Sequence, residues 1–148
     1  MTWKTKKFDE LTTTELYKIL YLRTATFVVE QNRIYQEVDD KDPKAIHVFD
    51  MDENNNVLAY ARIYLIEDGA KVSFGRVVTS KQARGKGLGR QLIKQIMAAI
   101  NQYFPNKTIE IEAQKQVEGY YQKFGFVSHG KPFIFESTPH VIMTHAAV

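Results

Sequence analysis

The sequence predicts a mixed α+β fold with a central, largely antiparallel sheet and helices on both of its faces. Around the middle of the chain, three strand patterns follow one another across two short turns, which is typical of antiparallel pairing. Strand and helix do not alternate throughout, as a doubly wound parallel sheet would require. Residues 57–67 are apolar on both faces of the predicted strand, which indicates a central strand covered on both sides.

Composition narrows the class of protein. The chain has 148 residues, 44% hydrophobic and 25% charged, which fits one soluble domain, residues 1–148. The net charge of +3 is mild and no basic run is interleaved with aromatic residues, so nucleic acid is not an expected partner. The absence of cysteine excludes disulfides, thiolate zinc sites and a cysteine nucleophile. No signal peptide or apolar run of about eighteen residues is present, so we expect a cytoplasmic protein that does not enter the membrane.

The N-terminal elements follow from local patterns. Residues Trp3–Phe8 are short and mixed, and predict an edge strand. Thr12 and Glu15 have capping-box spacing, and apolar residues then recur at helical spacing, which predicts a helix over 13–28. Residues 29–43 show no clear periodicity and predict a loop with a short helical turn.

That loop carries a string of acidic residues, Glu37, Asp39, Asp40 and Asp42. Three interpretations are open: a cation site, an electrostatic attraction for a polyamine or lysine-bearing acceptor, and a solvated loop. Solvation is the interpretation that we favour, because charge runs usually face water.

The middle of the chain predicts consecutive strands. Residues 46–51 and 57–67 are joined by the polar turn 52–56, and a hairpin turn at 67–70 leads into a strand over 71–78. The remaining elements are a long helix, a strand, a short helix and two closing strands, at 88–104, 108–113, 117–124, 126–135 and 141–144. Pro105 stops the long helix, Gly125 suits a left-handed cap, and a turn is predicted over 136–140.

The stretch from Arg84 to Gly89 organises the second half. Three glycines at alternate positions let backbone N–H groups approach an anion, and the helix that follows adds its unpaired first-turn N–H groups. A Walker loop needs Ser or Thr after its lysine, whereas Lys86 precedes Gly87. A dinucleotide fingerprint needs G-x-G-x-x-G, which this stretch does not have. A phosphate or pyrophosphate cradle of another kind is therefore predicted.

Four features in order resemble the GCN5-related N-acetyltransferases (GNAT family). They are the strand before Arg84-x-x-Gly87-x-Gly89, the strand ending at Ala113, Gln114-x-x-Val117-x-x-x-Tyr121, and Tyr121-x-x-x-Gly125-Phe126. The third is similar to the family's Asn-x-x-Ala-x-x-x-Tyr with two substitutions. Near the N-terminus, Leu22-Arg23-x-x-x-Phe27-Val28-Val29-Glu30-Gln31 resembles the ElaA-like branch, as does Pro139-His140-Val141-Ile142-Met143. That branch has Cys-Pro where this chain has Arg33-Ile34, so details of that loop do not carry over.

The resemblance implies the GNAT fold, a sheet splayed between two strands, and transfer of an acetyl group from acetyl-CoA to a primary amine by direct attack on the thioester, with no metal. It places the cofactor against Val77, Val78, Thr79, Arg84, Gly85, Lys86, Gly87, Leu88, Gly89, Arg90 and Gln114. The diphosphate belongs to the glycine loop, the pantetheine arm to the gap between the splayed strands, and the thioester carbonyl to a backbone N–H near Val78.

The resemblance also implies a general acid, Tyr121, which would protonate the leaving thiolate; the alternative is that Tyr121 only packs. Candidates for the base are Glu112, Glu30 and His140. Either glutamate can instead bind the ammonium, or pair with Arg23 or Arg62. A lone histidine on a strand, such as His47, is more often structural.

A second function class stays open: a GNAT-fold module that binds acyl-CoA without transferring, as a sensor or partner protein. Nucleic-acid binding through the basic residues around the glycine loop is a third, which the modest net charge disfavours. The sequence does not identify the amine acceptor. It also leaves the oligomeric state open, with a homodimer through the closing strands as one option.

Overall fold

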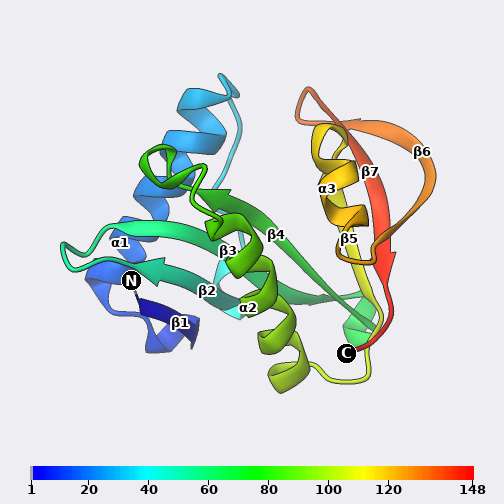
Figure 1. Cartoon of the computed structure of the whole chain (residues 1–148), viewed down its shortest axis with the longest axis horizontal. Helices are drawn as coiled ribbons and strands as arrows, with labels where there is room; N and C mark the ends of the chain where they lie inside the picture. The colour runs from blue at the N-terminus through cyan, green and yellow to red at the C-terminus, as the bar shows by residue number, and fades with distance from the viewer. Residues whose placement is uncertain (1) are drawn as a thin grey trace.

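The computed structural model describes residues 2–148. Their strands form one seven-stranded sheet in the order β1-β2-β3-β4-β5-β7-β6 (Figure 1). The strands are β1 (Thr2–Lys7), β2 (Ile46–Met51), β3 (Val57–Ile66), β4 (Lys71–Thr79), β5 (Ile109–Gln114), β6 (Val127–Phe135) and β7 (Thr138–His145). Neighbouring strands are antiparallel except for β4 and β5, which run parallel. The predicted mixed, largely antiparallel sheet is confirmed.

Helices cover both faces of this sheet, as predicted. They are α1 (Thr13–Arg23), α2 (Leu88–Tyr103) and α3 (Glu118–Gln122). Apolar residues of α1 pack with Phe49 and Tyr60 on one face, while those of α2 and α3 pack with Val48 and Ala61 on the other. Since these four side chains come from β2 and β3, both strands are central. No helix of the described chain, residues 2–148, is long and apolar enough to cross a membrane.

The start of α1 is set by its predicted capping box. Thr12 Oγ1 accepts from the Glu15 N–H at 3.0 Å, and Glu15 Oε1 accepts from the Thr12 N–H at 2.9 Å. Glu15 is buried and also accepts from the ammonium groups of Lys4 and Lys6. The cap therefore also fastens the edge strand β1 to the helix.

The end of α1 differs from the prediction. The α-helix ends at Arg23 rather than Val28, and the chain continues as a π-helix, η2 (Thr24–Glu30). Its wider winding shows in the bond from the Gln31 N–H to the Thr26 carbonyl oxygen, 3.2 Å across five residues. Over so short a segment, the hydrophobic spacing of the two windings is too similar for a sequence pattern to separate them.

The short helix and the closing hairpin also differ from prediction. A 3₁₀ turn at 115–117 precedes α3, which spans only 118–122. The predicted turn over 136–140 is wrong, because Glu136 and Ser137 alone turn the chain, with φ of 47° and 64°, as a two-residue hairpin requires. Pro139 lies inside β7 although proline is typical of turns. His140 therefore lies in the strand, opposite Gln114 of β5.

Strands β4 and β5 stay together only at one end. Their pairing is confined to Val72 opposite Ile109, beside a 3.1 Å bond from the Val72 N–H to the Thr108 carbonyl oxygen. Farther along, the strands diverge (Figure 1). On its other edge β4 carries a bulge, where the register against β3 shifts and Arg76 has a φ of 54°. Bulges bend a strand and redirect side chains.

Two carboxylates of the acidic loop, Glu37 and Asp42, are buried, so the favoured interpretation of a solvated loop was wrong for them. Glu37 and Asp42 are 5% and 4% exposed. The Arg23 guanidinium donates to both carboxylates, with Arg23 Nη1 2.8 Å from Asp42 Oδ1 and Nε 2.9 Å from Glu37 Oε2. Arg62 donates to Asp39 and Asp42. This buried ion cluster fastens the irregular loop to α1 and to β3.

Breaking this cluster should destabilise the fold strongly. Asp42→Asn removes the carboxylate that Arg23 and Arg62 share. The cluster then holds an excess of positive charge, and uncompensated buried charge costs about 3 kcal/mol or more. Urea unfolding followed by circular dichroism measures the free energy of unfolding. Asp40→Asn is the matched control, because Asp40 is exposed, and should stay within about 0.5 kcal/mol of the wild type. Equal stabilities of the two variants would contradict the assignment.

Stability should also fall in acid. Burial opposes ionisation of Glu15, but hydrogen bonds from the Thr12 N–H and two lysines outweigh it and lower the Glu15 pKa to about 2. Burial likewise opposes ionisation of Asp39, and Arg62 outweighs it, which lowers the Asp39 pKa to about 2. Unfolded carboxyl groups titrate near about pH 4. The stabilisation is therefore present above about pH 4 and is lost as the pH falls toward about 2.

Urea unfolding at a series of pH values tests this dependence. Glu15→Gln removes one of the two contributions, so its free energy of unfolding should fall less steeply with acid than that of the wild type. Identical slopes would show that Glu15 has no depressed pKa.

Candidate active site

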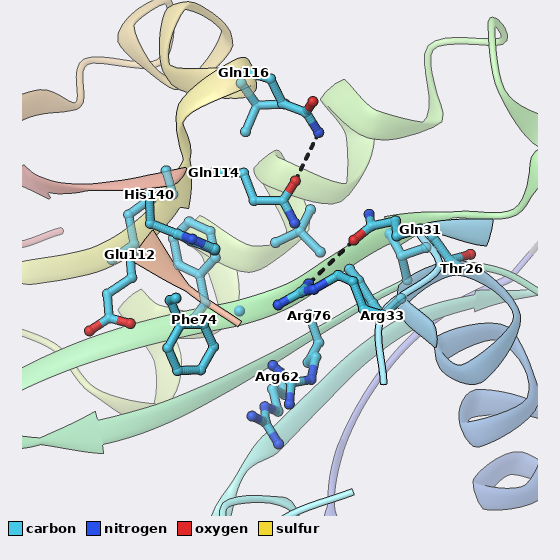
Figure 2. Close-up of a pocket in the computed structure, with 18 of the residues that line it drawn as sticks. Thr26, Gln31, Arg33, Arg62, Phe74, Arg76, Glu112, Gln114, Gln116 and His140 are labelled. Atoms are coloured by element: carbon cyan, nitrogen blue, oxygen red, sulfur yellow. Dashed lines mark hydrogen bonds between the residues drawn. The ribbon is translucent and has the colours of Figure 1, made fainter. Parts of the chain in front are cut away.

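A pocket of about 590 Å³ opens where β4 and β5 diverge. Its lining includes Phe74, Gly75, Arg76, Val77, Val78 and Thr79 of β4, and Ile111, Glu112, Ala113 and Gln114 of β5. The π-helix, the loop that follows it and the β6–β7 hairpin supply further walls. Figure 2 shows Glu112, Gln114 and His140 on one side of this pocket, with Arg33 and Arg76 facing them from the other.

The diverging strands leave backbone groups without a strand partner. Because the pairing of β4 with β5 is confined to Val72 and Ile109, the facing edges farther along present N–H and C=O groups to the pocket. Buried backbone polar groups need partners. An extended chain that carries amides could lie between the strands and supply them, as a peptide does when it adds to a sheet edge.

The glycine loop lies at the start of α2. Gly85 and Gly87 have φ of 83° and 77°, with open space around both, and side-chain-bearing residues would be strained there. At Gly89, a Cβ would lie 3.1 Å from the Tyr120 hydroxyl oxygen. The first turn of α2 has no acidic residue to neutralise its free N–H groups. The loop therefore fits a diphosphate.

Arg84 in this loop is held by Glu30 at the end of the π-helix. Two parallel bonds of 2.8 Å join Arg84 Nη1 and Nη2 to the two carboxylate oxygens. The Arg84 hydrogen bond, its largest influence, lowers the pKa of Glu30. The expected structural partners of Glu30, Arg23 and Arg62, instead belong to the ion cluster. Glu30, a candidate base, and Arg84, a predicted contact of the cofactor's diphosphate, are therefore paired with each other.

Tyr121 lines the pocket from α3 while most of its ring is buried. The ring centroid lies 6.0 Å from that of Phe74 and 5.7 Å from that of Phe126. Burial, the main cause, raises the pKa of the phenol well above its usual value. Tyr121 is therefore protonated at neutral pH, so its hydroxyl carries a hydrogen that it can donate.

His140 lines the pocket from β7. Its ring is stacked on Phe133, with 6.0 Å between centroids, and Nδ1 is 2.8 Å from the Thr138 carbonyl oxygen. Since a carbonyl oxygen only accepts, Nδ1 carries the hydrogen, and Nε2 of the neutral ring is an acceptor. By contrast, His47 bonds to the Tyr60 hydroxyl and the Asp42 carbonyl oxygen, which agrees with its predicted structural role.

The fold gathers most of the predicted site residues at this pocket. Those that line it are Glu30, Val77, Val78, Thr79, Arg84, Glu112, Gln114, Tyr121 and His140. The others, Gly85, Lys86, Gly87, Leu88, Gly89 and Arg90, form the adjoining loop and the first turn of α2. The Leu88 side chain is buried in the core, so only its backbone could contact a ligand.

Sequence reasoning missed one wall of the pocket. Gln31, Arg33 and Tyr35 line it from the irregular segment after the π-helix. This segment has no periodicity from which an inward face could be inferred. The contact of Arg33 with the distant β6–β7 hairpin, where Nε donates to the Glu136 carbonyl oxygen at 3.1 Å, has no local signal in the sequence.

Comparison with known proteins agrees with this geometry. Residues 10–147 match the family profile described as "Acetyltransferase (GNAT) domain". The chain belongs to the GNAT family. Protein ElaA of Escherichia coli strain K12 is 33% identical over 149 residues, covering 99% of this chain and 97% of that protein. This relative confirms the ElaA-like branch.

Solved structures agree as well. The crystal structure of an acyl-CoA N-acyltransferase from Pseudomonas aeruginosa is 36% identical, with a TM-score of 0.92, and covers 98% of this chain and 99% of that one. The crystal structure of Escherichia coli ElaA is 34% identical, with a TM-score of 0.89 and 97% coverage of both chains. This GNAT protein therefore has the acyl-CoA N-acyltransferase fold.

If a diphosphate binds at the glycine loop, Glu30 should compete with it for Arg84, which gives a test of the loop. Glu30→Gln should tighten CoA binding a few-fold, because Arg84 no longer has to leave a carboxylate before it pairs with phosphate. Isothermal titration calorimetry measures the Kd. Glu53→Gln, which removes an exposed carboxylate from the β2–β3 turn, controls for net charge and should leave the Kd unchanged. Equal Kd values in both variants would rule the competition out.

Proposed function

We propose that this GNAT protein transfers the acetyl group of acetyl-CoA to a primary amine. The observation that carries the proposal is the pocket between β4 and β5, which opens beside the glycine loop and has the buried phenol of Tyr121 in its wall. Family membership supports an acyltransferase. The proposal adds that the acyl group is acetyl and that the acceptor is a primary amine.

In this proposal the glycine loop binds the diphosphate through backbone N–H groups, with charge from Arg84, Lys86 and Arg90. The pantetheine amides pair with the free edges of β4 and β5, and the Gln114 side chain adds an amide contact. The Val78 N–H polarises the thioester carbonyl. Acetyl-CoA supplies an activated acyl group and a thiolate leaving group.

Side chains of the protein accept and donate the protons of the reaction. As the new C–N bond forms and the C–S bond breaks, the amine loses a proton to a base and the thiolate gains one from Tyr121. His140 is the base that the geometry favours, because its Nδ1–H is held by Thr138 and Nε2 is left to accept. Glu30 is less suitable, since Arg84 holds both of its oxygens.

Thiol release from acetyl-CoA with a panel of amines tests both the function and the acid. The wild type should release CoA in an amine-dependent way, and Tyr121→Phe should lower kcat about 10²-fold, which is typical for loss of a general acid. The Kd for CoA should be almost unchanged, because the phenyl ring keeps its packing.

Tyr103→Phe is the control, because this tyrosine lies at the far end of α2 and should retain full turnover. No amine-dependent release by wild-type protein that binds CoA would favour the non-catalytic alternative. Unchanged turnover in Tyr121→Phe would remove this residue from the mechanism.

A further inference from the structure

Arg33 brings a positive charge to the pocket that no carboxylate of residues 2–148 neutralises. Its Nε donates to the Glu136 carbonyl oxygen at 3.1 Å, and its Nη1 to Gln31 Oε1 at 3.3 Å. Both acceptors are neutral. Arg33 as a residue is partly buried, and a cation withdrawn from water usually has an anionic partner.

The other arginines of the pocket differ in this respect. Arg62 pairs with Asp39 and Asp42, Arg76 with Glu37, and Arg84 with Glu30. These ion pairs cancel the positive charges of the three arginines within the protein. Lys41 also lines the pocket, but its ammonium is solvent-exposed and lies 4.9 Å from the centroid of the Tyr64 ring.

The Arg33 guanidinium is held in place before any ligand arrives. Its Cζ lies 4.6 Å from the centroid of the Tyr35 ring, and the Arg76 guanidinium lies 5.6 Å from the same ring. Stacking and the two neutral hydrogen bonds restrict the guanidinium, while Nη2 has no partner among the described residues. The Nη2 hydrogens and the second hydrogen of Nη1 are left to donate, and a carboxylate can accept from both nitrogens.

We propose that the acceptor is a small amine with a free carboxylate, an amino acid or a close analogue, and that Arg33 binds this carboxylate. The inference rests on the proposed N-acetyltransferase function and names its substrate class. Arg33 faces the wall that carries His140 (Figure 2), so the carboxylate lies on one side and the amine can point to the other. The pocket of about 590 Å³ also includes the gap for the pantetheine arm, which leaves room for a small acceptor.

A single uncompensated guanidinium favours a monoanion. A phosphate monoester carries close to two charges at neutral pH, and Glu37 already occupies Arg76, the nearest second cation around Tyr35. A carboxylate needs only Arg33. The diphosphate of CoA is assigned to the glycine loop, so Arg33 variants should leave the Kd for CoA unchanged.

The test compares α- and ω-amino acids with their own carboxamides as acceptors at saturating acetyl-CoA. Wild-type kcat/KM should be at least about 10-fold higher for the acid than for the amide, as expected for a charge-assisted bidentate pair. Arg33→Gln should reduce this acid-to-amide ratio at least about 10-fold relative to the wild type. Comparing the ratio between proteins cancels the different basicities of the two amines.

Two further variants serve as controls for this test. Lys131→Gln removes an exposed cation of β6 outside the pocket and should keep the wild-type ratio, while Arg33→Lys should keep part of it. Thermal unfolding and CoA titration show that each variant is folded. Transfer to amines without any preference for acids, or a preference that survives in Arg33→Gln, would overturn this inference alone. Failure to acetylate every amine would overturn the proposed function and this inference with it.

Discussion

The site depends on the limited pairing of two neighbouring strands. β4 and β5 meet at Val72 and Ile109 and then diverge, so each keeps its outer partner, β3 or β7, but loses the inner one. The sheet remains continuous because those outer ladders hold each half. The cost is a set of backbone groups without strand partners, and in a ligand-binding protein such groups are the means of binding. Fold stability and ligand binding therefore draw on opposite edges of the same strands.

The buried ion cluster holds an irregular segment in place, so that this segment can form a wall of the pocket. Residues 31–41 have few backbone hydrogen bonds of their own, yet Glu37 is fastened from two sides by Arg23 and Arg76. Buried ion pairs add little net stability compared with an apolar core, but they tolerate few alternative arrangements. Because Arg76 also lies near the Tyr35 ring, the cluster reaches directly to the wall that carries Arg33.

Two groups expected to act separately are in fact linked. Glu30 and Arg84 are 54 residues apart in sequence and form a bidentate pair beside the pocket. The pair joins the end of the π-helix to the glycine loop, so these two parts of the pocket wall share one electrostatic contact. A ligand phosphate that draws Arg84 away would leave Glu30 free to meet a cation, which couples the two halves of the site.

Sequence alone determined the features that depend on local patterns. Hydrophobic spacing predicted the order of strands and helices, the capping box at Thr12 predicted the start of α1, and the glycine motif predicted the turn before α2. Motif order also indicated the family and several of the residues that line the pocket. Tertiary structure decided what depends on contacts between distant residues: the burial of Glu37 and Asp42, the partner of Glu30, and the inward position of Arg33. A charged residue has the same local pattern whether water or a distant guanidinium compensates it, so only the folded chain shows which one does.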